Sequence, residues 1–251
     1  MPASPFTKRT LAFLRALKRN NDREWFRARK SEYEQHVRGP MVALLGQLAR
    51  DLPVFAPDLV SDPRVSMFRI YRDTRFSHDK RPLKTNVAAH FPSRKFPKGE
   101  GAGLYVEIAP QWVWIGGGIY MPTPIELQAI RAGIGKDHRK FHRVVTAPAF
   151  RRAVGELSGD QLTRVPRGYP KDHPAADFLR HKQFVGGREY PADFAVSPRF
   201  YPELLAVFRG IAPLVGFLNH AIISRTNHGL ALDIPRARDW FDSVSGRASH
   251  A

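Results

Sequence analysis

The sequence predicts an α+β fold with an N-terminal helical segment, a central, mostly antiparallel β-sheet that contains a hairpin, and helices that cover the sheet. Three observations lead to this prediction. Apolar residues recur every three or four positions in the first 50 residues, a β-rich hairpin lies in the middle of the chain, and helical spacing returns in the last third. With 251 residues, 43% of them hydrophobic, the chain is long enough to bury a core.

The first elements are predicted to be helices. Thr7 and Asp22 stand as N-cap residues before two helical patterns, and Gly39-Pro40 precedes a third. Leucines at helical spacing mark one face of the first and third patterns: Leu11, Leu14, Leu17, Leu44, Leu45 and Leu48. A helical layer therefore opens the domain.

The middle of the chain is predicted to form strands. RVSMFRIY (64–71) is rich in β-branched and aromatic residues, and GLYVEIAPQWVWIGGGIY (103–120) reads as a hairpin, with strands at 104–109 and 112–120 around a Pro-Gln turn. Gly116-Gly117-Gly118 has two interpretations, a loop that cradles phosphate or close packing within a strand. Because the P-loop spacing and its Lys-Ser/Thr pair are missing, close packing or a bulge is favoured.

Helices are predicted again after the hairpin. Thr123-Pro124-Ile125-Glu126 is a capping box with proline at the first helical position, and Pro148 and Ser197-Pro198 begin later helices. Residues 174–182 are predicted as a helix and 183–190 as a strand or extended loop. The apolar pattern fades beyond about Ile223, so we expect one α+β domain over 1–222 and a polar C-terminal tail over 223–251.

Composition narrows the class of protein. Lys and Arg number 40 against 23 Asp and Glu, a net charge of +17, which points either to anionic partners or to a general compositional bias. The absence of cysteine excludes disulfides, thiolate zinc sites and thiol nucleophiles. The N-terminus lacks the apolar run of a signal peptide, and no segment has the ~20 apolar residues of a membrane span, so a cytoplasmic location is expected.

The densest basic stretch covers residues 64–98. It holds ten Lys or Arg residues against Asp73 and Asp79. After a strand-like start, FSHDKRP has the composition of a turn, so Arg75, Lys80 and Lys84 could surround one concavity while the two aspartates hold the cations in place. Arg and Lys there would receive phosphate or carboxylate. The alternative is a solvated loop whose charges pair with one another.

Three segments, NNDREWFRARKSEYE, FRIYRDTRFSHDKRPLKTN and GYPKDHPAADFLRHKQF, occur in this order. With them the chain resembles the family of domain of unknown function 2461, from about Phe6 to Ile222. The resemblance implies a single-domain protein of a kind found mostly in bacteria and also in fungi, and it supplies no mechanism. His78, Arg81 and Leu83 stand where Lys, Thr and Tyr are more usual, between positions that do match.

The resemblance and the charges together give a candidate ligand-binding set. In the third segment, Lys171 and His173 would face an anion near the N-terminus of the following helix, and Asp172 or His173 would cap that helix. A helix cap with nothing bound is the other interpretation. The candidate residues are Arg72, Asp73, Arg75, Ser77, Asp79, Lys80, Lys84, Lys171, Asp172 and His173.

Other chemistry is disfavoured. His138 and His142 have metal-ligand spacing, but Arg139 stands where a zincin carries its glutamate. Ser77-His78-Asp79 contains triad residue types as sequence neighbours, which do not point at one another. Asp73, Asp79 and Glu107 could hold Mg²⁺, yet cations outnumber carboxylates there. No metal and no cofactor is expected.

Three functions stay open, and the sequence does not decide whether the protein is an enzyme. The first is binding of a phosphate-bearing or acidic small ligand in a basic pocket. The second is association with nucleic acid through a wider basic face, with aromatic residues available for stacking; that face comprises Arg23, Arg27, Lys30, Arg94, Lys95 and Lys98 with Trp25, Phe91 and Phe96. The third is a non-catalytic protein-interaction domain. The oligomeric state is not predicted.

Overall fold

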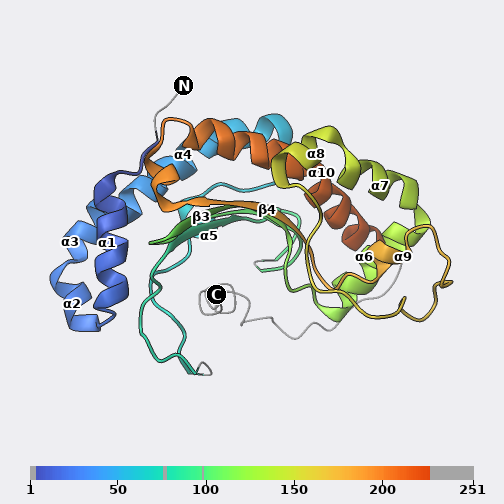
Figure 1. Cartoon of the computed structure of the whole chain (residues 1–251), viewed down its shortest axis with the longest axis horizontal. Helices are drawn as coiled ribbons and strands as arrows, with labels where there is room; N and C mark the ends of the chain where they lie inside the picture. The colour runs from blue at the N-terminus through green and yellow to red at the C-terminus, as the bar shows by residue number, and fades with distance from the viewer. Residues whose placement is uncertain (1–3, 76–77, 98, 227–251) are drawn as a thin grey trace.

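The computed structural model describes residues 4–75, 78–97 and 99–226 (Figure 1). The elements before the sheet are α1 (Lys8–Arg19), α2 (Arg23–Ala28), α3 (Lys30–Tyr33), the π-helical η1 (Glu34–Arg38), α4 (Gly39–Phe55) and α5 (Pro63–Ser66). The strands are β1 (Val87–Phe91), β2 (Gly103–Ile108), β3 (Trp112–Ile119) and β4 (Phe184–Pro191). The remaining helices are α6 (Pro124–Lys136), α7 (His138–Thr146), α8 (Pro148–Val154), α9 (Ala176–Leu179), the 3₁₀ helix η2 (Ala192–Val196) and α10 (Phe200–Thr226).

The strands form one antiparallel sheet in the order β1-β2-β3-β4. The predicted hairpin is confirmed as β2 and β3, whose turn is closed by a hydrogen bond from the Ala109 N–H to the Trp112 carbonyl oxygen (2.8 Å). Residues that point to one face are almost fully buried, as shown by Val106, Ile108 and Ile115. The sheet therefore has a distinct core-facing side, and the fold is the predicted α+β class.

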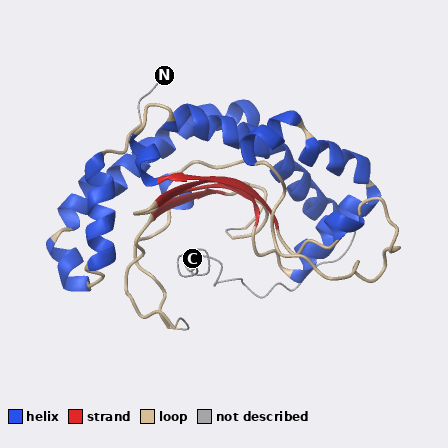
Figure 2. Cartoon of the chain, in the orientation of Figure 1, coloured by secondary structure: helices blue, strands red, loops and turns tan. Residues whose placement is uncertain are grey.

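The helices lie on the convex side of a curved sheet (Figure 2). α4 and α10 run along that side, while α1–α3 lie at one end of the molecule and α6, α7 and α9 at the other (Figure 1). α10 packs against β3 and β2, and an edge-to-face contact joins Phe208 to Phe91 of β1, with ring centroids 5.3 Å apart. Within the described residues, no helix packs over the concave side of the sheet.

Local capping sets where several helices begin, as predicted. The Asp22 carboxylate accepts hydrogen bonds from the backbone N–H groups of Glu24 and Trp25. Thr123 and Glu126 form the predicted capping box at the start of α6. Each of these side chains satisfies N–H groups that the first helical turn leaves without a helical partner.

The predicted strand at 64–71 is wrong. Pro63–Ser66 is a short helix in which the Asp62 carboxylate accepts a hydrogen bond from the Arg64 N–H, and proline at its first position favours that turn. The rest of the segment makes only single bridges, from Met67 to Ala89 and from Tyr71 to Leu83. The edge strand is instead β1, which lies inside the basic stretch and was not predicted as a strand.

In the C-terminal half, several of the helices and strands begin and end at residues other than those predicted. The helix predicted at 174–182 is the short α9, and the strand or loop predicted at 183–190 is β4. α10 continues to Thr226, so most of the predicted tail over 223–251 lies outside the described residues. Buried apolar side chains from Phe6 to Ile222 form one contiguous cluster. The single domain over 1–222 stays a prediction, and this cluster is consistent with it.

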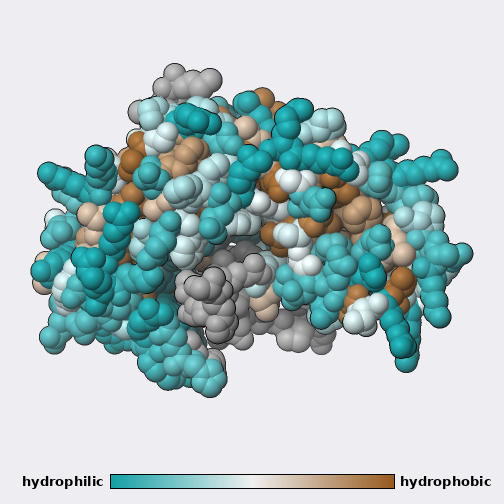
Figure 3. All heavy atoms as spheres, viewed as in Figure 1, coloured by the Kyte–Doolittle hydropathy of each residue, from teal (hydrophilic) through white to brown (hydrophobic). Residues whose placement is uncertain are grey.

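Among the described residues, α10 is the one helix long and apolar enough to cross a membrane by length and composition. About 67% of its most apolar window is buried inside the protein, as in a helix that belongs to the hydrophobic core. Hydrophilic side chains cover both ends of the molecule, over α1–α3 and over α7 and α9 (Figure 3).

Candidate ligand-binding site

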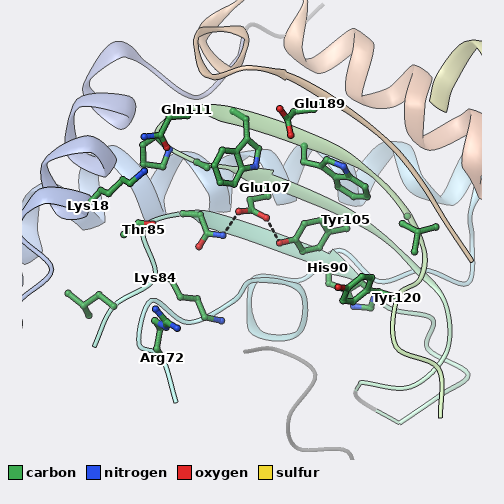
Figure 4. A pocket seen from close by; sticks show the side chains of 18 of the residues that line it. Lys18, Arg72, Lys84, Thr85, His90, Tyr105, Glu107, Gln111, Tyr120 and Glu189 are labelled. Atoms are coloured by element: carbon green, nitrogen blue, oxygen red, sulfur yellow. Dashed lines mark hydrogen bonds between the residues drawn. The ribbon is translucent and has the colours of Figure 1, made fainter. Parts of the chain in front are cut away.

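A cavity of about 420 Å³ lies against the concave face of the sheet. Its floor comes from all four strands, and its walls come from Arg72, from the chain leading into β1, from the β2–β3 turn and from Lys18 of α1. Figure 4 shows Arg72 and Lys84 on the segment that faces the sheet, with Glu107 and Tyr105 on the sheet itself. The volume falls in the range of small-molecule pockets, about 300–1,000 Å³.

Strand register sets the floor of the cavity. His90, Tyr105 and Gly116 are aligned across β1, β2 and β3, and the parallel row beside it aligns Glu107, Trp114 and Glu189 across β2, β3 and β4. Because side chains alternate between faces along a strand, both rows share the concave face. Polar and aromatic groups are thus collected there from residues far apart in the chain.

Glycines let two rings lie flat on the sheet. A Cβ atom at Gly187 would stand 2.1 Å from the Trp114 indole, and one at Gly116 would stand 2.6 Å from it. A Cβ atom at Gly103 would stand 2.3 Å from His90 Nε2. Close packing is therefore the confirmed interpretation of the glycine run in β3, since ring and backbone touch where any side chain would intervene.

Glu107 is a buried carboxyl group at the centre of the floor. It is 6% exposed, its Oε1 accepts a hydrogen bond from Asn86 Nδ2, and its Oε2 accepts one from the Tyr105 hydroxyl at 2.8 Å. Burial raises the pKa of Glu107, while the two hydrogen bonds and the positive charge of Lys84 lower it, and burial has the larger effect. The two hydrogen bonds therefore hold the Glu107 carboxyl group in a position where burial destabilises its ionised form.

Cations form the wall opposite Glu107. Lys84 is 6% exposed, its Nζ lies 5.0 Å from the centroid of the Phe68 ring, and its backbone N–H is bonded to the Ile70 carbonyl oxygen. The Arg72 guanidinium is bonded to Asp79, which also binds Arg81 (2.6 Å). Hydrogen bonds from Arg81 and then Arg72 hold the pKa of Asp79 well below its usual range. One carboxylate thus positions two arginines that line the cavity.

Other members of the predicted set lie in the same loop without lining the cavity. Arg75 pairs with Asp73 at 2.6 Å, its guanidinium is exposed, and it lowers the pKa of Asp73 to about 2. Lys80 donates from Nζ to the Thr74 carbonyl oxygen at 3.0 Å. Ser77 lies outside the described residues. In this half of the loop the charges pair with one another, as the alternative interpretation of the basic stretch expected.

The third segment lies elsewhere. Lys171 and Asp172 are exposed on the loop before α9, at the end of the molecule away from α1–α3, and neither lines the cavity (Figure 1). His173 Nδ1 accepts a hydrogen bond from the Ala175 N–H (3.0 Å), and its ring meets that of His138 edge-on, with centroids 5.9 Å apart. The predicted cap is therefore wrong: α9 begins at Ala176 with Ala175 as its N-cap residue and no side-chain cap, and His173 bonds only within the turn before it. The structure brings Arg72 and Lys84 together with Arg81 and Lys18, and it does not bring Lys171 to them.

Sequence reasoning missed most of the floor. It considered Glu107 only as a magnesium ligand, and it assigned no role to Tyr105, Trp114 and His90. The signal was present in the hairpin, because Tyr105, Glu107 and Trp114 alternate with aliphatic residues and must share the face opposite the core. In the described part of the chain, no group of three or more His, Cys, Asp or Glu side chains is arranged to hold a metal ion.

His90 makes stability sensitive to acid. It is 7% exposed, and burial lowers its pKa to about 4. In the unfolded chain His90 takes up a proton near the ordinary pKa of about 6.5. Its contribution to the free energy of unfolding is therefore fully present above that pH and is lost as pH falls toward 4. The pKa difference corresponds to roughly 3 kcal/mol at about 1.36 kcal/mol per unit.

We therefore expect His90→Gln to lose less stability than wild type between pH 7 and pH 4, by roughly 3 kcal/mol in the free energy of unfolding. Urea denaturation at several pH values measures it. His78→Gln, at an exposed histidine, should keep the wild-type acid dependence. Parallel curves for wild type and His90→Gln would show that His90 is not held neutral by the fold.

The fold and the cavity together define a class: an α+β protein whose helices cover one side of a curved antiparallel sheet, with a polar and aromatic cavity on the other. The model of the family described as "Conserved hypothetical protein (DUF2461)" matches residues 9–217. The chain belongs to this family, which confirms the resemblance seen in its three segments. No curated protein matches the chain.

Proposed function

We propose that the protein binds a small organic anion, a flat apolar body that carries a phosphate or carboxylate group, in the cavity on the concave face of the sheet. One observation carries this proposal: cationic side chains and flat aromatic surfaces line the same cavity of about 420 Å³. The cationic side chains favour the negative group of the ligand, and the aromatic surfaces favour its flat body.

The cationic part favours a negative group. Lys18, Arg72, Arg81 and Lys84 line the cavity, against the carboxyl groups of Glu107 and Glu189. Asp79 already orients the two guanidinium groups, which reduces the entropy lost when they bind a ligand. Planar guanidinium groups suit the paired oxygens of phosphate and carboxylate.

The aromatic part favours a flat body. The Trp114 indole lies against the glycines of β3 and β4, and the Tyr105 ring stands beside it with centroids 5.7 Å apart. Trp112 and Tyr120 also line the cavity. A planar ligand can stack on a ring that is already held in place, at little cost in side-chain entropy.

Nucleic-acid association fits the described side chains less well. Phe91, one of the three aromatic residues in that hypothesis, is fully buried against Phe208 and cannot stack on a base. Trp25 is partly covered by Arg29, whose guanidinium carbon lies 4.7 Å from the indole centroid. Lys98 lies outside the described residues. The protein-interaction hypothesis gains no specific support, so binding of a small anion is the function that we propose.

Matched pairs of probes test this function. Indole-3-acetate, salicylate and AMP carry a negative group, while indole-3-acetamide, salicylamide and adenosine are their neutral counterparts. We expect at least one anion to bind at low salt and to bind about tenfold or more tightly than its neutral partner, because a hydrogen bond to a charged group contributes about 1.5–3 kcal/mol. Isothermal titration calorimetry measures the affinities. Equal binding within every pair, or no binding by any anion, would refute the proposal.

A further inference from the structure

We propose that the cavity takes up its anion together with one proton, and that Glu107 is the group that receives this proton. The inference rests on the function proposed above and adds that the affinity for the anion depends on pH. The proton comes from the solvent buffer and forms an O–H bond on the Glu107 carboxyl group, so the complex gains one ligand and one proton, with no other bond made or broken.

The placement of Glu107 carries the first step. The carboxyl group is 6% exposed and lines the cavity in which the anion would sit. Hydrogen bonds from Asn86 and Tyr105 hold its two oxygens, so it cannot swing away from an arriving negative charge without giving them up (Figure 4). Two negative charges close together beside buried protein groups repel each other, and protonating the carboxyl relieves the repulsion.

Competition for Lys84 carries the second step. Lys84 lines the same cavity, and its positive charge favours ionised Glu107. A ligand anion that binds Lys84 shares this charge and shields it from the carboxylate. Ionised Glu107 therefore loses support at the same moment that it gains a negative neighbour. Both effects shift Glu107 toward its protonated form.

The other groups around Glu107 do not reverse this direction. Across β1 and β3 its neighbours in the sheet are Ala88 and Trp114, which carry no charge, and on β4 Glu189 adds further negative charge. The remaining cations of the cavity, Lys18, Arg72 and Arg81, belong to its walls, and a bound anion would engage them in the same way as Lys84. His90 and Tyr105 also belong to the titratable lining.

Two other groups offer rival explanations for proton uptake. Glu189 is exposed on the β4 edge, where water stabilises its charge. His90 is buried in the same cavity and is neutral near pH 7 because burial lowers its pKa to about 4. An anion beside His90 would also favour its protonation, so the experiment has to separate the histidine from the glutamate.

The test measures protons directly. Naphthalene-2-sulfonate serves as the probe because it is flat, negative and does not titrate between pH 5 and 8. Titration calorimetry at pH 6 in two buffers of different ionisation enthalpy, such as MES and imidazole, gives the number of protons taken up per probe bound. We expect uptake of up to about one proton in wild type, and an affinity that falls by up to about tenfold per pH unit as pH rises.

Variants assign the proton. Glu107→Gln keeps the shape and a hydrogen-bonding amide, so it should bind the probe with no proton uptake and with an affinity that no longer changes with pH. Glu189→Gln and His90→Gln should still take up a proton when the probe binds, even if its affinity changes, because Glu107 is present in both. Binding by wild type without uptake, uptake that persists in Glu107→Gln, or uptake abolished by His90→Gln would each overturn the inference. If none of the anions binds at any pH, the proposed function itself is refuted.

Discussion

Substituting Gly118 with alanine is expected to destabilise the protein by about 3 kcal/mol or more, through backbone strain and a clash between strands. Gly118 lies in β3 with a φ of +118°, a conformation that L-residues rarely adopt. A Cβ atom there would stand 2.0 Å from the Phe184 carbonyl oxygen on β4. That oxygen belongs to the backbone of a paired strand and cannot move without separating β3 from β4. Thermal and urea unfolding measure the loss.

Two glycines in helices provide the control. At Gly46 of α4 and Gly216 of α10, an added Cβ atom would meet no described atom within 4 Å apart from its chain neighbours and the adjoining backbone of its own helix. Alanine at either site should leave stability unchanged or raise it by up to about 1 kcal/mol, because alanine is the better helix former. A Gly118→Ala protein as stable as these two variants would contradict the β3 geometry. It would also remove the explanation given for the glycine run.

Helix starts were predictable because their causes are local. The carboxylate of Asp22 binds N–H groups two and three residues away, and Thr123 and Glu126 bind each other across a single turn. The hairpin was predictable for the same reason, since its two strands are joined by a short turn. All these contacts lie within the span over which a sequence pattern determines geometry.

The strand error shows where such reasoning stops. Residues 64–71 have β-forming side chains, yet a strand also needs a partner along its length, and Met67 and Tyr71 find only single bridges. Val87–Phe91, with two alanines and a histidine, has weaker propensity but pairs with β2 along all five residues. Tertiary pairing decided between the two segments, and propensity alone could not.

The candidate site was partly predictable. The composition of the loop made Arg72 and Lys84 candidate ligand-binding residues, and both line the cavity. Which loop cations would pair with loop aspartates instead, as Arg75 does with Asp73, depends on side-chain geometry that a charge count does not contain. Lys171 was predicted to share a ligand with Lys84, about 90 positions earlier in the chain. Sequence periodicity carries no information about contacts over such a separation.

Removing the charge of Lys84 is expected to weaken anion binding by about ten- to a hundredfold, the loss expected for a charged hydrogen-bond donor that is largely buried. Lys84→Met keeps the length and apolar stem of the side chain. It also keeps the backbone hydrogen bond to Ile70, so the fold should persist. Calorimetric titration with indole-3-acetate, alongside a thermal melt, separates lost binding from lost stability.

The matched controls are two lysines that the sequence analysis assigned to the same ligand. Lys80 is exposed and is bonded to the Thr74 carbonyl oxygen, and Lys171 is exposed on the loop before α9; neither lines the cavity. Lys80→Met and Lys171→Met each remove one positive charge, as Lys84→Met does. Any loss that comes only from the lower net charge should therefore be equal in all three and should shrink as salt is added. If binding depends on the cavity, Lys84→Met alone loses affinity at moderate salt; equal losses in the three variants would place the anion on the general basic surface instead.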